Sequence, residues 1–205
     1  ICYSMKQIDY GAEAEIFQIS PNWLLKKRSI QEYRHPKLDL RLRVRRTRRE
    51  FKVLDKLFKS SVNVPEVQEL NLDECAFQMG FIDGECIVEN MSFEVLTKSI
   101  IQIAKMHREG IVHCDLTPLN LILDKDNEVV LIDFGLSEFS ANREERAVDL
   151  NVFFIFLQND FPNLFSRKDE LLEVYREEFS DDSIVDEIFI RLEQIEKRGR
   201  NKNKN

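Results

Sequence analysis

Alternating and helical hydrophobic patterns divide the chain into two parts. Residues 8–19 have the pattern of two short strands around a turn of small residues at 11–14, and residues 23–26 have that of a third strand. Apolar positions then recur at helical spacing over residues 43–58, which predicts a long amphipathic helix followed by a further strand. We therefore expect a β-rich first part that contains one long helix.

The second part has mainly helical patterns and one hairpin. Ser92 is a suitable N-cap for a helix whose apolar residues share one face, and Gly110 ends that helix. Two short apolar strands, 121–123 and 129–132, follow it and are separated by polar turn residues at 124–128, so a β-hairpin is predicted. Two amphipathic helices finish the chain.

These patterns predict an α+β fold with two lobes. A β-rich N-lobe with one long helix is assigned to residues 1–79, a reduced and mainly helical C-lobe to 80–196, and a basic, flexible tail to 197–205. The chain has 205 residues, of which 43% are hydrophobic, so it can form two small packed lobes around a cleft.

The composition excludes several classes of protein. No apolar run approaches the roughly 20 residues of a membrane span, and the first residues lack the pattern of a signal peptide. The four cysteines are scattered, without the spacing of a zinc site or a disulfide framework. We expect a soluble protein of a reducing compartment, the cytoplasm or the nucleus.

Charge is distributed unevenly along the chain, whose net charge is -7. Residues 26–52 contain twelve Lys and Arg against three acids, and residues 197–205 add five basic groups and no acid. Two interpretations stay open for these basic segments: solvated surfaces, or contacts with a phosphate-rich partner such as RNA.

One carboxylate falls on the inward face of the long predicted helix. Glu50 shares that face with Thr47, Phe51 and Leu54. A buried carboxylate costs several kcal/mol unless a cation meets it, and Lys26, in the preceding strand, is the candidate partner. The alternative is that Glu50 lies at the edge of the apolar stripe and reaches water.

Polar side chains converge at one end of the predicted hairpin. If the strands pair symmetrically about Asp126 and Asn127, residues whose numbers sum to 253 face each other, which places Asn120 opposite Asp133. Asp115 lies just upstream, on the loop that enters the hairpin. Oxygen ligands of this kind suit magnesium, which takes the rest of its ligands from water and substrate phosphates.

This set of residues suits phosphoryl transfer, which needs positioning, charge neutralisation and a group that receives or orients the proton of the nucleophile. In this interpretation Asp115 is the base, and Asn120 and Asp133 hold the magnesium ions. Lys26, aimed by Glu50, is the cation on the α- and β-phosphates of ATP.

The same residues resemble a known family. His113-x-Asp115, with Asn120 five positions further on, and then Asp133-Phe134-Gly135 match the catalytic loop and the metal-binding motif of protein kinases. Over nearly the whole chain, further segments resemble the small kinase of the KEOPS complex, the PRPK family, which is related to the RIO kinases. These segments are Gly11–Ala14, Lys26 and Arg28 followed by Tyr33–Pro36, Arg45–Glu50, Asp115–Thr117, Ala147–Leu150 and Arg198–Arg200.

The resemblance implies a minimal two-lobed, protein-kinase-like fold and further roles for individual residues. Nucleotide contacts are assigned to the phosphate loop and the adenine hinge: Gly11, Ala12, Glu13 and Ala14 in the loop, and Met79, Gly80 and Ile82 in the hinge. Asp149 would brace the catalytic loop from a buried helix. The alternative for Asp149 is an ordinary acid near a helix N-terminus, where the helix dipole favours it.

The resemblance also implies an activity and partners. It implies a Mg-ATP-dependent phosphotransferase or ATPase, with serine/threonine (auto)kinase activity, that supports threonylcarbamoyladenosine modification of tRNA. Implied partners are the threonylcarbamoyl-transferase subunit, other KEOPS subunits and tRNA, but no membrane. Three features depart from typical protein kinases: the phosphate loop has one glycine, Thr117 stands where a lysine is common, and about 70 residues follow Gly135. Whether proteins are the physiological substrates therefore stays open. The alternatives are a nucleotide-binding scaffold without catalysis and a small-molecule kinase.

Overall fold

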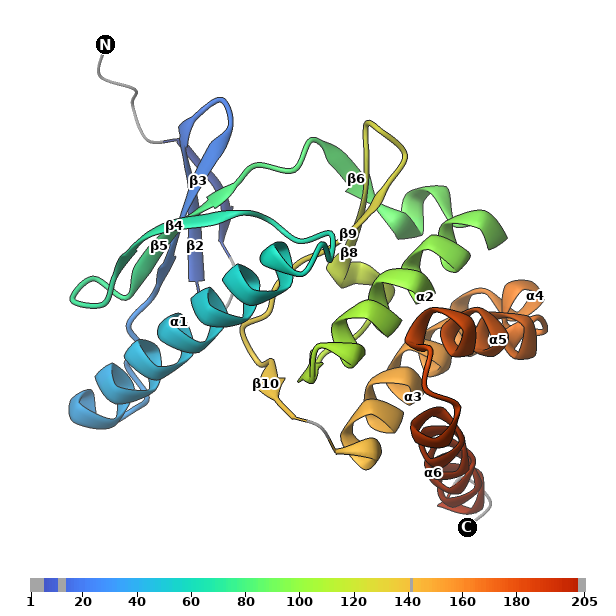
Figure 1. Cartoon of the computed structure of the whole chain (residues 1–205). Coiled ribbons are helices and arrows are strands. Elements are labelled where there is room, and N and C mark those ends of the chain that lie inside the picture. The colour runs from blue at the N-terminus through green and yellow to red at the C-terminus, as the bar shows by residue number, and fades with distance from the viewer. Residues whose placement is uncertain (1–5, 11–13, 141, 203–205) are drawn as a thin grey trace.

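The computed structural model describes residues 6–10, 14–140 and 142–202, and it forms two lobes (Figure 1). The N-lobe contains β1 (Lys6–Tyr10), β2 (Ala14–Ser20), β3 (Trp23–Arg28), α1 (Pro36–Lys59), β4 (Val67–Asn71) and β5 (Ala76–Gly80). The C-lobe contains β6 (Gly84–Cys86), the 3₁₀ helix η1 (Ile87–Asn90), α2 (Phe93–Arg108), β7 (Ile111–Val112), the 3₁₀ helix η2 (Pro118–Asn120), β8 (Leu121–Asp124), β9 (Val129–Leu131), β10 (Glu138–Phe139), α3 (Arg143–Asp160), α4 (Pro162–Phe165), α5 (Lys168–Phe179) and α6 (Asp182–Lys202).

In the N-lobe sheet, two cationic side chains of one strand point toward α1. The sheet is antiparallel and has the order β1-β2-β3-β5-β4, so β3 is its central strand. Side chains alternate along a strand, and Leu24, Lys26 and Arg28 are the buried residues of β3. Both Lys26 and Arg28 reach Glu50 on α1.

The N-lobe differs from the sequence expectation in two places. Helix α1 begins at Pro36, earlier than the expected residue 43, because proline suits the first helical turn and the buried Asp39 carboxylate accepts a hydrogen bond from Arg43 Nε at 2.7 Å. Two strands follow α1 instead of one. They are joined by a turn in which the side-chain oxygen of Asn71 accepts two backbone N–H groups, each at 3.1 Å.

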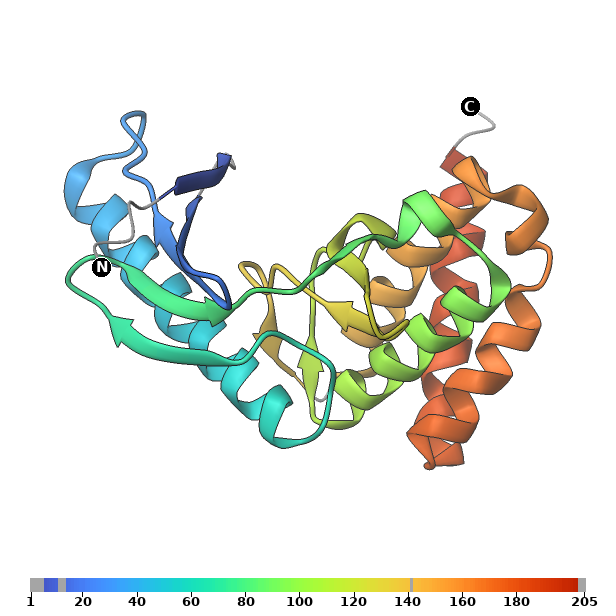
Figure 2. The same ribbon diagram turned by 90° about the horizontal axis from the view of Figure 1, so that it is seen from above.

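The C-lobe begins with α2, whose two ends follow the sequence expectation. Ser92 caps it by accepting the Val95 N–H at 3.2 Å, and Gly110 follows its last turn with a φ of 70°. Helix α2 packs against α5, and α3 packs against α6. Figure 2 shows the hairpin and α2 between the N-lobe and these terminal helices, so the hairpin lies next to the junction of the lobes.

The last helix extends beyond the expected start of the tail. Helix α6 runs to Lys202, past residue 197, and buries Val185, Ile188 and Leu192 in the C-lobe core. No helix within residues 6–10, 14–140 and 142–202 combines the length and the apolar character that crossing a membrane requires.

The hairpin of β8 and β9 has a different register from the predicted one. Leu121 pairs with Leu131, so paired residue numbers sum to 252 and the expected sum of 253 was wrong. Asn120 therefore lies opposite Ile132, whose N–H donates to the Asn120 carbonyl at 3.0 Å. Asp133 comes one residue later, where the chain leaves the hairpin.

A three-residue loop causes this shift of register. The loop consists of residues 125–127 and is closed by a hydrogen bond from the Asp124 N–H to the carbonyl of Glu128 at 2.9 Å. Asn127 adopts a φ of 62°, the left-handed conformation that such loops place before the second strand. The Asp124 carboxylate accepts the N–H groups of Asp126 and Glu128 at 2.9 and 2.8 Å, which stabilises this three-residue loop instead of a pairing symmetric about Asp126 and Asn127.

Candidate active site

A cleft of about 610 Å³ between the lobes contains the described site residues that the sequence predicted. Its volume is in the usual range for a small-molecule site. Gly11, Ala12 and Glu13 of the expected phosphate loop lie outside the described residues. The predicted residues that line the cleft are Ala14, Lys26, Glu50, Met79, Gly80, Ile82, Asp115, Asn120 and Asp133.

Lys26 connects the two lobes within this cleft. Its Nζ donates to Glu50 Oε1 at 2.7 Å and to Asp133 Oδ1 at 2.9 Å. Burial alone would lower the pKa of Lys26, but the two carboxylates outweigh it and raise that pKa above its ordinary value. Burial alone would raise the pKa of Asp133, but Lys26 outweighs it and lowers that pKa. Lys26 and Asp133 are therefore both charged at neutral pH.

A second cation, which the sequence analysis did not assign, also holds Glu50. Arg28 Nη2 donates to Glu50 Oε2 at 2.5 Å, and the Glu50 side chain is only 1% exposed. The predicted Lys26 partner is confirmed, and the alternative of a solvated Glu50 is wrong. The signal for Arg28 was the alternation of β3, which places positions 26 and 28 on one face.

The D-F-G segment turns its first residue toward the cleft and its second into the core. Asp133 has a φ of 57°, and the Phe134 side chain is fully buried, with its ring centroid 4.8 Å from that of His113. At Gly135 a Cβ would lie 3.1 Å from Arg28 Nη2 and 3.2 Å from Asp133 Oδ1. Glycine at this position therefore lets the chain pass close to the charged cluster.

Asp149 holds the backbone of the catalytic loop. Its carboxylate accepts the N–H of His113 at 2.6 Å and that of Cys114 at 2.9 Å, and it contacts His107 Nε2 at 3.2 Å. Cys114 has a φ of 64°, a strained conformation for a residue with a side chain. The bracing role is confirmed, because a simple helix-terminal acid would be solvated, whereas Asp149 is 1% exposed.

The bracing network extends to α5 through residues that the sequence analysis did not find. His107 Nδ1 lies 2.9 Å from the Tyr175 hydroxyl. Because the Asp149 carboxylate only accepts, we assign the proton of His107 to Nε2, and Tyr175 then donates to Nδ1. Burial lowers the pKa of His107 and raises that of Tyr175, so both are neutral. No local pattern could reveal this contact, because 68 residues separate its partners.

Asp115 and Asn120 face the open side of the cleft. Asn120 Nδ2 donates to the Asp115 carbonyl at 2.8 Å and approaches its carboxylate at 3.3 Å. This contact orients the amide so that its nitrogen faces Asp115, and the amide oxygen is the atom suited to a cation.

The donor set fits magnesium shared with a nucleotide. It offers the carboxylate of Asp133, whose side chain is 56% exposed, and the amide oxygen of Asn120. Within the described part of the chain, no group of three or more His, Cys, Asp and Glu residues could hold a metal ion. Magnesium usually has only one or two protein carboxylates and completes its shell with phosphates and water, so this small oxygen set is adequate.

The expected hinge begins at the end of β5, and backbone hydrogen bonds hold it to two other segments of the N-lobe. The Gly80 N–H donates to the Glu66 carbonyl at 2.8 Å, and the Phe81 N–H donates to the Asn22 carbonyl at 2.9 Å. Met79 and Ile82 line the cleft on either side of these two residues. The segment therefore forms one wall of the cleft, and its contact with adenine stays a prediction.

Comparison with known proteins identifies the family of the chain. Residues 23–161 match the model of the RIO domain. The chain is 36% identical over 190 residues to a probable serine/threonine-protein kinase BUD32 homolog of Archaeoglobus fulgidus, with 93% of each chain covered. It is 35% identical over 213 residues to the KEOPS complex subunit Bud32 of Pyrococcus abyssi, with 96% of each covered.

Longer relatives contain a similar segment. A probable bifunctional tRNA threonylcarbamoyladenosine biosynthesis protein of Methanospirillum hungatei is 36% identical over 190 residues, which cover 93% of this chain but only 35% of that protein. The present chain thus spans about a third of such relatives.

A solved structure has the same fold. The Rio2 kinase of Chaetomium thermophilum, in a complex with ADP, magnesium and phosphoaspartate, matches with a TM-score of 0.62 and 15% identity, covering 96% of this chain and 72% of that one. The expected two-lobed kinase-like fold is thereby confirmed. The sequence matches show that the chain belongs to the RIO domain family of atypical serine/threonine kinases, to which its Bud32 relatives are similar.

Proposed function

We propose that the chain is a Mg-ATP-dependent phosphotransferase or ATPase that supports threonylcarbamoyladenosine modification of tRNA, with serine/threonine (auto)kinase activity. One observation carries this proposal. The Lys26 ammonium lies between Glu50 and Asp133, and it joins the lobes in a cleft that Asp115 and Asn120 also line. Phosphoryl transfer depends mainly on such positioned charges.

Each residue has a distinct task in this proposal. Lys26 carries three N–H donors, so it can keep its bond to Glu50 while it donates to the α- and β-phosphates. Asp133 and Asn120 would hold magnesium, which when bound neutralises charge on the phosphates. Asp115 would accept a hydrogen bond from the attacking hydroxyl or water and receive its proton. Met79, Gly80 and Ile82 would hold adenine, and Gly11, Ala12, Glu13 and Ala14 would cover the phosphates.

The names of the relatives support the biological setting. One relative is a KEOPS subunit, and longer ones are named for threonylcarbamoyladenosine biosynthesis. We therefore propose the threonylcarbamoyl-transferase subunit, other KEOPS subunits and tRNA as partners. The three described cysteines, Cys75, Cys86 and Cys114, are free thiols, which supports a reducing compartment such as the cytoplasm or the nucleus.

The test compares Asp133→Asn with the wild type. We expect ATP hydrolysis and phosphate transfer, measured with and without tRNA and the partner subunit, to fall about 100-fold or more, because a charged group at the reacting phosphates is lost. Asp126→Asn is the matched control, since that exposed side chain lies in the hairpin loop outside the cleft.

Nucleotide binding, measured with a fluorescent ATP analogue, distinguishes the alternatives. If the wild type and Asp133→Asn show equal ATP turnover and both bind nucleotide, the enzyme hypothesis is refuted and the protein is a nucleotide-binding scaffold. Transfer to a small-molecule acceptor, with neither autophosphorylation nor a response to tRNA, would favour a small-molecule kinase.

A further inference from the structure

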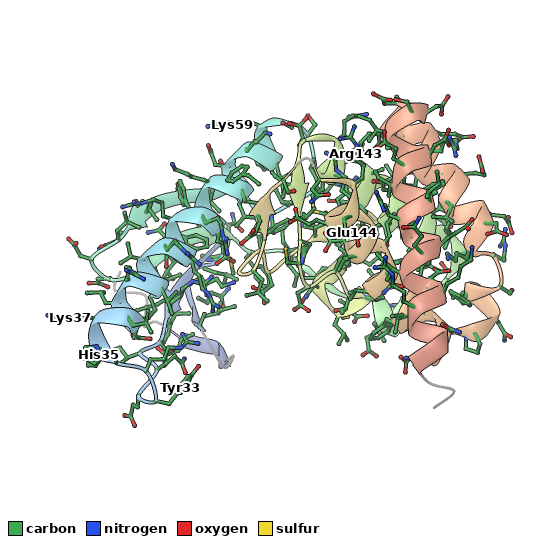
Figure 3. All side chains as sticks on the ribbon, turned by 90° about the horizontal axis from the view of Figure 1, so that it is seen from below. Tyr33, His35, Lys37, Lys59, Arg143 and Glu144 are labelled. Carbon is green, nitrogen blue, oxygen red and sulfur yellow. The ribbon has the colours of Figure 1, made fainter. Side chains whose placement is uncertain are left out.

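A second cavity, of about 650 Å³, lies on the outer face of α1 beside β10. We call it the α1 groove. Six cations line it: Lys37, Arg41, Arg45, Arg48, Arg49 and Lys52. Five of them recur at intervals of three or four residues, so they form one stripe along the helix, about 22 Å long. Figure 3 shows α1 from this side, with Lys37 near its start and Lys59 at its end.

The groove is separate from the catalytic cleft. Thr47, Glu50 and Val53 form part of the buried face of α1, whereas Arg41, Arg45 and the other cations of the stripe are exposed. The two cavities therefore use opposite faces of one helix, and substitutions in the groove leave the cleft residues in place.

Among the described residues, most of the positive charge of the groove is not neutralised by an ion pair. No acidic residue lines it, and Arg49 pairs with Glu138 at 2.6 Å at its edge. Among residues 6–10, 14–140 and 142–202, the five cations of the stripe form no ion pair. Like charges four residues apart on a helix repel each other, so this stripe costs stability unless an anion is bound.

The remaining lining residues indicate what kind of anion fits. Leu40 and Val44 provide apolar surface, and the ring of Phe139 on β10 is 51% exposed. A row of arginines suits regularly spaced phosphates, because the guanidinium binds phosphate through two N–H groups. An exposed aromatic ring beside such a row is the arrangement on which nucleic-acid bases stack.

We propose that the α1 groove binds RNA, with the cations of the stripe on successive phosphates and Phe139 stacked on an unpaired base. The choice of RNA rests on the proposed function, in which tRNA is a partner. The binding itself is measured without ATP, so it can fail or succeed independently of catalysis.

The test is the salt dependence of RNA binding. The variant Arg41→Gln/Arg45→Gln/Arg48→Gln removes three cations but keeps residues that favour a helix. With transcribed tRNA and a short oligouridylate as probes, we expect the slope of log affinity against log salt to decrease by roughly 2 to 3, because fewer counterions are released. The affinity should fall about 10- to 100-fold at about 0.1 M salt.

The matched control is a triple variant at exposed cations outside the groove: Lys59→Gln, Lys125→Gln and Arg191→Gln. It has the same net charge as the groove variant, and we expect a much smaller loss of RNA affinity. ATP hydrolysis without RNA should be the same in both triple variants and in the wild type.

Three results would overturn parts of the proposal. Equal salt slopes in the two triple variants would refute RNA binding in the groove. Polyglutamate serves as a second anionic probe, a mimic of an acidic protein. If the groove variant loses polyglutamate binding but keeps RNA binding, the groove binds an acidic protein instead of RNA. Phe139→Ala should lower oligouridylate affinity about fivefold or more without changing the salt slope, and unchanged affinity would remove the stacking contact. Absent ATP hydrolysis with intact RNA binding would instead refute the proposed function.

Discussion

Glu50 is the anion at the centre of the N-lobe charge cluster, so its replacement tests the structure directly. The side chain is 1% exposed and binds Lys26 at 2.7 Å and Arg28 at 2.5 Å. Glu50→Gln keeps the size and shape of the residue but removes its charge. Arg28 then faces an amide in a buried site, while Lys26 retains the carboxylate of Asp133.

The expected cost follows from this environment. Removing one partner of a buried ion pair costs about 3 to 5 kcal/mol, because the other charge stays buried. We expect the lower end, about 3 kcal/mol, since Lys26 keeps Asp133, whose side chain is 56% exposed. For a chain of this size each kcal/mol lowers the melting temperature by about 2 to 4 °C, so the shift should be about 6 to 12 °C.

Thermal unfolding and urea titration measure this change in the free energy of unfolding. The control is Asp55→Asn on the same helix, where the pair with Lys59 at 2.7 Å is exposed and contributes about 0.5 kcal/mol or less. ATP turnover of Glu50→Gln should also fall, because Lys26 loses a partner that orients it. A Glu50→Gln protein as stable as the control would refute the placement of Glu50 between two cations.

Three further predictions concern the bracing network of the C-lobe. Asp149→Asn should lower ATP turnover about tenfold or more, with little change in the KM for ATP, because the N–H groups of His113 and Cys114 lose a charged acceptor. Steady-state kinetics measure both constants, and an unchanged turnover number would contradict this prediction. Tyr175→Phe should reduce the free energy of unfolding by about 1 to 3 kcal/mol, since His107 Nδ1 loses its donor, and an unchanged urea midpoint would exclude that bond. Because burial lowers the pKa of His107 below its ordinary 6.5, the unfolded chain binds the proton first, so stability should fall from pH 7.5 to 5.5. Urea titrations should show a flatter pH dependence for His107→Gln, and equal slopes would refute this assignment.

Much of the site could be predicted from local patterns. The spacing of His113, Asp115 and Asn120 and the following D-F-G segment predicted a catalytic loop, because it resembles that of protein kinases, and the structure places Asp115, Asn120 and Asp133 in one cleft. The inward position of Glu50 on an amphipathic helix required a cation, and the structure contains the expected bond to Lys26. The Glu50 inference is confirmed because it depends on a short segment with a strong period, whereas the catalytic roles stay a prediction.

Other features could not be predicted in this way. The hairpin register depends on whether its loop has two or three residues, and the sequence DKDNE is compatible with both until the Asp124 carboxylate is placed. In the observed register Asn120 lies opposite Ile132, whereas the predicted register placed it opposite Asp133. The side chains of Asn120 and Asp133 nevertheless both line the cleft. A shift of one residue in the hairpin register therefore changes which residues pair directly, but it leaves Asn120 and Asp133 in the same cleft.

The sequence by itself determined most of the elements, the two lobes and the residue types that line the cleft, because hydrophobic period, caps and motif spacing act over a few residues. Only the tertiary structure decided which distant groups meet: Arg28 with Glu50, Tyr175 with His107, and Phe139 with the arginines of α1. The physical reason is that such contacts depend on how whole helices and strands pack. Burial and neighbouring charges then set the protonation state of each group and the free-energy cost of burying it. Neither can be assigned to a residue before its neighbours are known.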